Sequence, residues 1–292
     1  MPKSLIYRVV RSGEVRVNKG RAHVDTRLQS GDEVRIPPIR YTEKESEHSA
    51  PPLKLSEMPP ILFEDQNIMV VDKPAGMASH GGSGISYGLI ERMRASRPEL
   101  PFLELVHRLD RGTSGVLVLA KTRKALVRLH EMIREGEMHK TYQALVKGDW
   151  QNDRQHAKFP LFKYVTPSGE RRVRVDPENG LPSHSIFRLK ERFGPVSLVE
   201  VDLLTGRTHQ IRVHAAELGF PLVGDEKYGD FAFNDEVAHG SLGVPFKRMF
   251  LHSGKICFHH PITGEELEIE APLPKDCLEL IEVLEQRKAQ NK

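Results

Sequence analysis

The sequence is poor in cysteine and contains no long apolar run. Its 292 residues include two cysteines, Cys257 and Cys277, too few for a disulfide framework or a cysteine-rich zinc site. No stretch of about 18 apolar residues occurs, and the first residues lack the apolar core of a signal peptide. We therefore predict a cytoplasmic protein without membrane contact. With 38% hydrophobic residues the chain can bury one large domain and a small additional part.

Several motifs of metal and cofactor chemistry are also absent. The 14 histidines form no His-Glu-x-x-His pattern, and the spacing of His209 and His214 does not place both on one helix face. The glycine-rich stretch at 80–84 lacks the Gly-Lys-Ser/Thr that would make it a P-loop. No dinucleotide-binding fingerprint and no Ser-His-Asp arrangement can be identified. We expect no metal site and no cofactor.

Positive charge is concentrated at the N-terminus. The formal net charge is +3, but residues 1–40 hold nine Lys or Arg against four acids, so they carry +5 and the remainder carries −2. The cations that we expect to bind a partner are Arg8, Arg11, Arg16, Lys19 and Arg21. A basic module on a near-neutral body indicates a polyanion partner, because each neutralised phosphate releases counterions. A solvated basic face without a partner explains the charge equally well.

Residues 1–40 have the pattern of a small module. Leu5, Ile6 and Val9 lie at helical spacing, and short strands are expected at 14–17 and 33–36. The pattern resembles the second half of an S4 RNA-binding domain without its usual first helix. Either a longer start precedes this sequence, or this version has lost part of the module.

The rest of the chain divides by composition. Residues 41–60 are polar and charged and include four prolines, so we expect a mobile linker. Residues 61–274 have the composition of a globular domain, and 275–292 are expected to form a C-terminal helix with a frayed tail.

The globular part is expected to contain more strand than helix. The strands are predicted at 68–72, 116–120, 140–146, 184–189, 196–203 and 249–258, and the helices at 87–97, 122–135 and 208–218. Strands joined by short turns, without a steady βαβ alternation, favour an α+β domain with a largely antiparallel mixed sheet.

Asp110 is the first candidate for chemistry. It lies in the loop of "LVHRLDRGTSGVLVLA" (105–120), between apolar stretches that are expected to be buried. Such a loop can hold a side chain in one orientation, and an aspartate in partly buried surroundings needs a partner. Alternatively, Asp110 is a turn residue that accepts hydrogen bonds from the backbone of 112–114.

A second candidate is Arg212 in "TGRTHQIRVHAAELG" (205–219). Thr208 is expected to cap a helix that ends at Gly219, which puts Arg212 in the first turn, where the helix dipole disfavours a cation. A carboxylate partner would offset this effect. Arg207 and His209 lie at the same helix entrance. The alternative is a surface arginine with its stem on apolar neighbours.

A third candidate is Tyr142. In a strand, Lys140, Tyr142, Ala144 and Val146 share one face. A tyrosine on such a face is commonly a core residue whose hydroxyl has one partner, so this pattern alone leaves its role open.

Several segments, in order, resemble the RluA family of pseudouridine synthases. They are "IMVVDKPAGMASHGG" (68–82), "HRLDRGTSG" (107–115), "HKTYQALVKG" (139–148), "GRTHQIRVHAAELGFPLVGDEKYG" (206–229) and "FLHSGKICFHHPITGEELEIEAPLP" (250–274). The resemblance covers about 61–274. Together with the N-terminal module, the spacer between the first two segments is most similar to the branch that modifies bacterial 23S ribosomal RNA.

The resemblance implies a cofactor-free isomerisation of uridine. The C1′–N1 bond is broken, the base turns, and C1′ is joined to C5. Asp110 would be the catalytic carboxylate, and Arg212 would hold it ionised through an ion pair. Tyr142 would stack on the base and help to remove the C5 proton, with Ile211 as the apolar wall beside the base.

The resemblance also implies how RNA is bound. A uridine in folded RNA must be flipped out to react, and Arg108 would fill the gap that it leaves. His107, Arg207 and His209 are expected to bind the substrate, whereas the role of Arg111 stays open. The expected partner of a monomeric enzyme is 23S ribosomal RNA or an assembly intermediate of the large subunit.

Two other functions are compatible with the sequence. A nucleoside glycosidase would pair Asp110 with a second carboxylate, such as Asp202 or Asp225, and would release free base. A catalytically impaired ribosomal-RNA-binding or assembly factor, or a synthase with another structured RNA target, would retain the same motifs.

Overall fold

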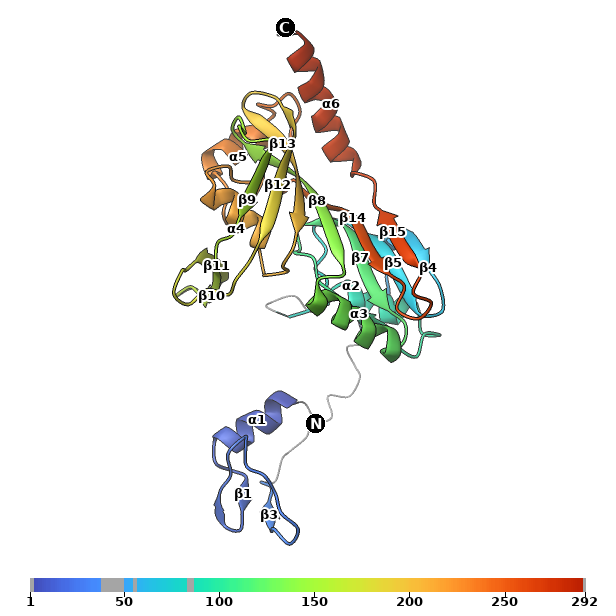
Figure 1. The fold of residues 1–292 in the computed structure, drawn as a ribbon, viewed down its shortest axis with the longest axis vertical. Helices are drawn as coiled ribbons and strands as arrows, with labels where there is room; N and C mark the ends of the chain where they lie inside the picture. Colours follow the sequence, from blue (N-terminus) through green and yellow to red (C-terminus); the bar gives the residue numbers. More distant parts are fainter. Residues whose placement is uncertain (1–2, 38–49, 55–56, 83–86, 291–292) are drawn as a thin grey trace. The chain divides into compact units, whose positions relative to one another are not determined.

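The chain forms two compact units. The computed structural model describes residues 3–37, 50–54, 57–82 and 87–290, and it divides into unit 1, Met1–Ser49, and unit 2, Ala50–Lys292 (Figure 1). The part of the predicted linker at 41–49 lies outside the described residues. None of the helices in the described ranges has the length and apolar character needed to cross a membrane.

Unit 1 consists of a helix and a small antiparallel sheet. Its elements are α1 Lys3–Arg11, β1 Arg16–Val17, β2 Gly20–Arg21 and β3 Val34–Arg35, with β1 in the middle of the sheet. Asn18 and Lys19 have φ of 49° and 66°, as a two-residue hairpin turn of type I′ requires. The helix and the final strand match the sequence prediction.

Unit 2 is built on a ten-stranded mixed sheet. The strand order is β4-β5-β7-β14-β8-β13-β12-β9, with β15 beside β14 and β6 beside β7. The bounds are β4 Ile61–Glu64, β5 Ile68–Lys73, β6 Glu104–Leu105, β7 Ser114–Ala120, β8 His139–Lys147, β9 Arg154–Ala157, β12 Ser185–Arg192, β13 Val196–Leu203, β14 Leu251–His259 and β15 Glu266–Glu270. β7 and β14 are parallel, and the other pairings described in this sheet are antiparallel. The α+β prediction with a mostly antiparallel sheet is confirmed.

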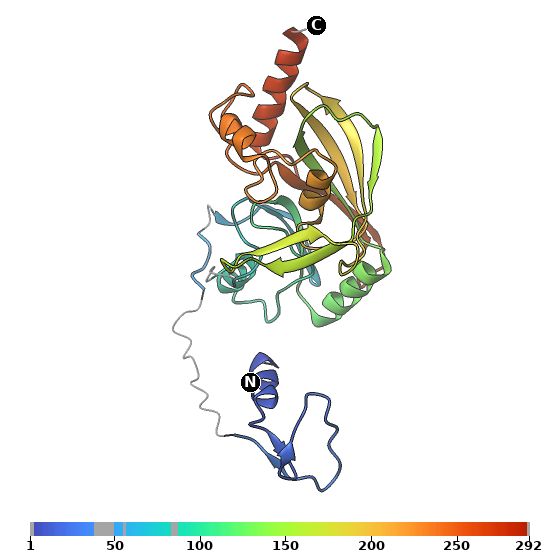
Figure 2. The same ribbon diagram turned by 90° about the vertical axis from the view of Figure 1, so that its left-hand side faces the viewer.

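Helices and one separate hairpin complete unit 2. They are α2 Leu89–Ser96, α3 Arg123–Glu135, α4 Gln210–Glu217, α5 Phe231–Ala238, α6 Lys275–Gln290 and the hairpin of β10 Leu161–Val165 with β11 Arg171–Val175. In Figure 2 this hairpin extends away from the main sheet. Thr122 caps α3, because its Oγ1 accepts a hydrogen bond from the Ala125 N–H at 3.2 Å.

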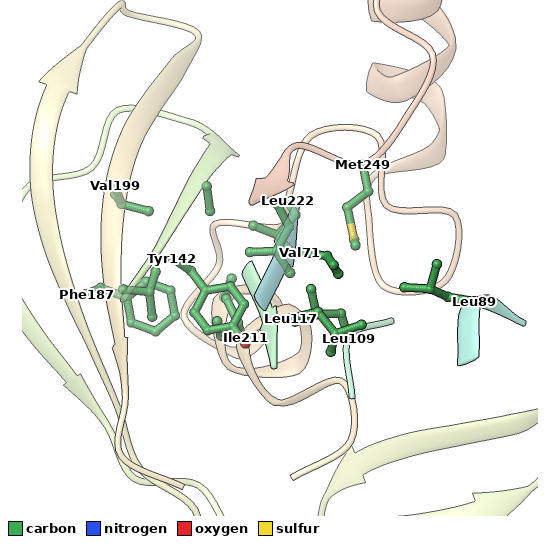
Figure 3. Packing of buried hydrophobic residues seen from close by; sticks show 14 of the residues in the cluster. Val71, Leu89, Leu109, Leu117, Tyr142, Phe187, Val199, Ile211, Leu222 and Met249 are labelled. Carbon is green, nitrogen blue, oxygen red and sulfur yellow. The ribbon is translucent and has the colours of Figure 1, made fainter. Parts of the chain in front are cut away.

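The alternating faces of β7 pack into two cores. Val116 and Val118 belong to a cluster with Ala125 and Leu129 of α3. On the other face of the strand, Leu117 belongs to a central cluster that also contains Leu89, Leu109, Tyr142 and Ile211 (Figure 3). The continuous apolar run of this strand is therefore explained by burial on both faces. The central cluster supports the candidate site described below.

Two parts outside the predicted globular range pack onto unit 2. Leu53, inside the segment predicted to be a linker, is 7% exposed, and its N–H donates a hydrogen bond to Ser96 Oγ at 2.7 Å. The prediction of an unpacked linker up to residue 60 is therefore wrong at this position. Likewise, α6 buries Cys277, Leu280 and Leu284 in a third cluster, so it is packed against unit 2 rather than a free terminal helix.

Gly115 allows β7 and β14 to approach each other closely. Its φ is +110°, and a Cβ at this position would lie 2.2 Å from the main-chain oxygen of Ser253. We expect Gly115→Ala to lower the free energy of unfolding by about 3 kcal/mol, because backbone strain and steric overlap add. Gly219→Ala is the control, since its φ is +85° but nothing lies within 4 Å of the added Cβ; it should cost about 1 kcal/mol. Equal losses in urea unfolding would contradict this view of the strand contact.

Candidate active site

The loop that carries Asp110 is fixed at both ends. The Val106 N–H donates a hydrogen bond to the Val118 oxygen, which extends the pairing of β6 with β7. The buried Ser79 hydroxyl donates to the Leu109 oxygen at 2.8 Å and accepts from the Leu109 N–H at 3.1 Å. The Leu109 side chain lies in the central cluster (Figure 3). The residue before Asp110 therefore has little freedom.

His107 bonds to the backbone rather than pointing a free nitrogen at a substrate. Its Nε2 accepts a hydrogen bond from the Val118 N–H at 3.2 Å, and the ring also bonds to the backbone of Arg108. Burial lowers the pKa of His107 to about 3, with a smaller effect from Lys140 in the same direction. The imidazole is thus neutral and holds the loop. Its contact with the substrate stays a prediction, since the His107 ring also lines the cavity described below.

Asp110 faces Arg212. The turn expected at this position is made by the main chain, where the Thr113 N–H donates to the Asp110 oxygen at 3.1 Å. The carboxylate Oδ2 lies 3.1 Å from Arg212 Nη1 and 3.9 Å from His209 Nε2, and the Asp110 side chain is 27% exposed. Of the two interpretations of Asp110 left open by the sequence, the geometry favours the carboxylate held in place by an arginine.

Arg212 is held by a second carboxylate. Its Nε and Nη2 donate to the two oxygens of Asp225, each at 2.7 Å, and its guanidinium lies 5.1 Å from the centre of the Tyr228 ring. Burial opposes the charge of Arg212, but the hydrogen bonds and charge of Asp225, followed by those of Asp110, raise its pKa above the ordinary value. Burial likewise opposes the charge of Asp225, yet Arg212 and two backbone N–H groups lower the pKa of this carboxyl. Both partners therefore stay charged.

The start of α4 differs from the prediction. Thr208 does not cap the helix; the residue at the cap position is His209, with φ of 54°, and its side chain makes no capping bond. Instead, Gln210 Oε1 accepts hydrogen bonds from Thr205 Oγ1 and from the Arg207 N–H, which closes the turn. His209 Nδ1 lies 2.7 Å from the Tyr228 hydroxyl, so this strained residue is held beside Asp110.

Tyr142 and Ile211 form an apolar wall near Asp110. They are 5% and 4% exposed and lie close together in the central cluster (Figure 3). Burial raises the pKa of Tyr142 to about 12, while a hydrogen bond with Ser253 acts in the opposite direction. The phenol is therefore protonated near neutral pH. The sequence could not separate a core role from a site role, and the structure places Tyr142 in both.

A cavity of about 660 Å³ brings the predicted residues of unit 2 together. Its lining includes all of them: His107, Arg108, Asp110, Tyr142, Arg207, His209, Ile211 and Arg212. The lining further includes Arg134, Lys140 and Lys163, whereas Asp110 is its one acidic residue. Burial lowers the pKa of Lys140 to about 8. The lining thus combines apolar side chains, among them Tyr142 and Ile211, with several cations and one carboxylate.

The cations predicted in the N-terminal module lie in unit 1. Arg11, Arg16, Lys19 and Arg21 are exposed there, and the Arg8 side chain lies outside the described part of the chain. Arg21 Nη2 donates a hydrogen bond to the Arg11 oxygen at the end of α1. This bond engages one of the four exposed side chains, and most of the charges stay available to solvent.

Three residues in or behind the site were not predicted from the sequence. Asp225 was considered only as a second carboxylate of a glycosidase, and Tyr228 was not singled out. Lys73 is buried, its Nζ donates to the Pro74 and Met77 oxygens, and burial lowers its pKa to about 7. A signal for Lys73 exists, since this lysine ends a strand that is otherwise mostly apolar. The partner of Asp225 lies 13 positions away in sequence, and only the fold reveals it.

The arrangement does not fit a pair of glycosidase carboxylates. Both oxygens of Asp225 are used by Arg212, and its side chain is 1% exposed. Asp202 pairs with Arg188 at 2.5 Å and does not line the cavity. Among the residues described, no group of three or more His, Cys, Asp or Glu is placed to hold a metal ion.

The buried neutral state of His107 predicts a dependence of stability on pH. Between about pH 4 and 6 the unfolded chain takes up a proton at a histidine of pKa about 6.5, but the folded chain does not. The contribution of His107 to the free energy of unfolding is therefore present above pH 6.5 and falls with decreasing pH, by up to about 1.4 kcal/mol per unit. We expect the difference in unfolding free energy between wild type and His107→Gln, measured in urea titrations, to shrink as the pH is lowered. A difference independent of pH would contradict a neutral His107, and His239→Gln, at a 77% exposed side chain, is the surface control.

Comparison with known proteins shows the family of this chain. Residues 67–217 match the RNA pseudouridylate synthase family. The chain is 50% identical to the ribosomal large subunit pseudouridine synthase C of Salmonella typhi, over 97% of this chain and 89% of that protein, and 50% identical to the protein of that name from Escherichia coli K12, over 96% and 88%. The solved structure of human RNA pseudouridylate synthase domain containing 1 is 29% identical and superimposes with a TM-score of 0.62, covering 76% of this chain and 86% of that one. The chain belongs to the RNA pseudouridylate synthase family and is an isomerase of the RluA type.

Proposed function

We propose that this enzyme isomerises specific uridines of large-subunit (23S) ribosomal RNA. The observation that carries the proposal is the Asp110 carboxylate, held 3.1 Å from Arg212 at a cavity with Tyr142 and Ile211 on its apolar side. The relatives named as large-subunit synthases, at about half identity over nearly the whole chain, support the choice of RNA.

The reaction needs a charged group at the sugar and a surface for the base. Breaking the C1′–N1 bond, turning the base and joining C1′ to C5 conserves every atom, while a proton leaves C5 and one is taken up at N1. Asp110 acts at the sugar as the ionised carboxylate. Arg212 orients it, because the guanidinium donates a hydrogen bond to one carboxylate oxygen within an ion pair.

Tyr142 and Ile211 are proposed to bind the uracil ring. Stacking on an aromatic face is worth about 1–3 kcal/mol per base in single-stranded RNA complexes. With a pKa of about 12, the Tyr142 hydroxyl is protonated before the substrate binds. Any help with the C5 proton therefore requires transfer of the hydroxyl proton in the complex, and the cations around the cavity would favour a phenolate.

Arg108 is proposed to replace the flipped uridine in the RNA. Its side chain is exposed, lines the cavity beside Asp110 and belongs to the fixed loop. A planar guanidinium can stack between bases and contact phosphate at the same time. Arg207 and His209 lie at the same opening and are proposed to contact the substrate.

Unit 1 is proposed to act as an S4-like RNA-binding module. Its exposed Arg11, Arg16, Lys19 and Arg21 suit contacts to phosphate, which would add affinity without reading sequence. We propose that the enzyme works as a monomer in the cytoplasm, on 23S ribosomal RNA or on an assembly intermediate of the large subunit.

The role of Asp110 is tested by Asp110→Asn. We expect the variant to fold and to bind large-subunit ribosomal RNA like wild type but to lose conversion by about a thousandfold or more, because the amide carries no charge to act at the sugar. Conversion is measured by carbodiimide labelling and primer-extension stops, since product and substrate have equal mass. Asp235→Asn, at a 78% exposed side chain, is the matched control. Substantial conversion by Asp110→Asn would refute the assignment.

A further inference from the structure

A second cavity shares its lining with the first. It measures about 450 Å³, and Arg108, Leu109, Asp110, His209 and Arg212 line both cavities. Tyr142 and Ile211 line only the first cavity, whereas Gly76, Arg111, Arg171 and Lys247 line only the second. The Asp110–Arg212 pair therefore lies in the wall shared by two cavities, and only the first of them contains Tyr142 and Ile211.

The wall of the second cavity is fixed by hydrogen bonds. The Gly76 N–H donates to the Arg111 oxygen at 2.8 Å, which ties the segment after β5 to the loop after Asp110. Lys73 Nζ bonds to the Pro74 and Met77 oxygens inside the same segment. A Cβ added at Gly76 would meet nothing within 4 Å. Because glycine has no side chain, the backbone of another chain can come close to this wall.

The second cavity is strongly cationic. Its lining holds seven Lys or Arg against two acids, Asp110 and Glu226. Arg111, Arg171 and Lys247 are exposed, and within the described part of the chain no carboxylate lies within 4.0 Å of their charged atoms. By contrast, Lys227 and Arg248 of the same lining are paired with Glu170 and Asp276. The unpaired cations suit a bound polyanion.

The geometry points to the path of the RNA strand: we infer that the second cavity binds the sugar-phosphate backbone next to the flipped uridine, with Arg111 and Lys247 contacting its phosphates. This rests on the proposed function. If the base lies against Tyr142 and the sugar lies at Asp110, the phosphates on either side of that sugar must leave by the other opening at Asp110. Arg111, next to the catalytic residue in sequence, thereby receives a role in binding rather than in chemistry.

The inference is tested with Arg111→Gln and Lys247→Gln in the full chain. Single-turnover conversion of transcribed large-subunit ribosomal RNA is measured against enzyme and salt concentration. Each variant should raise the half-saturating enzyme concentration about tenfold, by loss of one charged contact. Each should also make the slope of log affinity against log salt shallower by about 0.7. The rate at saturation should stay as in wild type. Lys190→Gln, which removes a half-exposed lysine that lines neither cavity, is the control.

Two results would overturn the inference. Half-saturation and salt slope equal to those of Lys190→Gln would show that these cations do not contact RNA. A lower saturating rate with unchanged half-saturation would show that Arg111 acts on the chemistry. A wild-type enzyme that binds this RNA without converting it would instead refute the proposed function, and the salt slopes of binding would still test the second cavity.

Discussion

The buried guanidinium of Arg212 is the interaction on which the candidate site depends. A cation in the first turn of a helix is disfavoured by the helix dipole and by burial, so Arg212 requires compensation within unit 2. Asp225 supplies it through two hydrogen bonds of 2.7 Å. The remaining nitrogen, Nη1, is then available to hold Asp110 at 3.1 Å. One arginine thus connects a buried structural carboxylate with the one proposed to react.

The two carboxylates differ because their surroundings differ. Asp225 is almost fully buried, accepts backbone hydrogen bonds as well, and cannot reach a substrate. Asp110 is 27% exposed and has Arg212 as its partner on one side, so its other side faces the cavities. The loop that presents it is held by Ser79, which bonds to the Leu109 backbone, and by His107, which bonds to the Val118 backbone on β7. The site combines a fixed carboxylate with open space beside it.

Much of this arrangement could be predicted from local sequence patterns. The strand of Tyr142, the cap at Thr122 and the α+β class follow from periodicity and turn chemistry, which act over a few residues. The pairing of Arg212 with Asp225 and the left-handed His209 at the helix start could not be predicted, because both depend on contacts made after folding. The same holds for Leu53, whose burial overrides the polar composition around it. The motifs identified the candidate residues, and the fold identified what holds them.

A double-mutant cycle at Arg212 and Asp225 tests the central claim most directly. Single-turnover rates of pseudouridine formation at saturating RNA would be compared for Arg212→Lys, Asp225→Asn and the double variant, with folding checked by urea unfolding. If the shared guanidinium positions Asp110, each single change should lower the rate by about a hundredfold and the double variant should be no slower than the slower single one. Rates near wild type in the single variants, or losses that multiply in the double variant, would contradict the account.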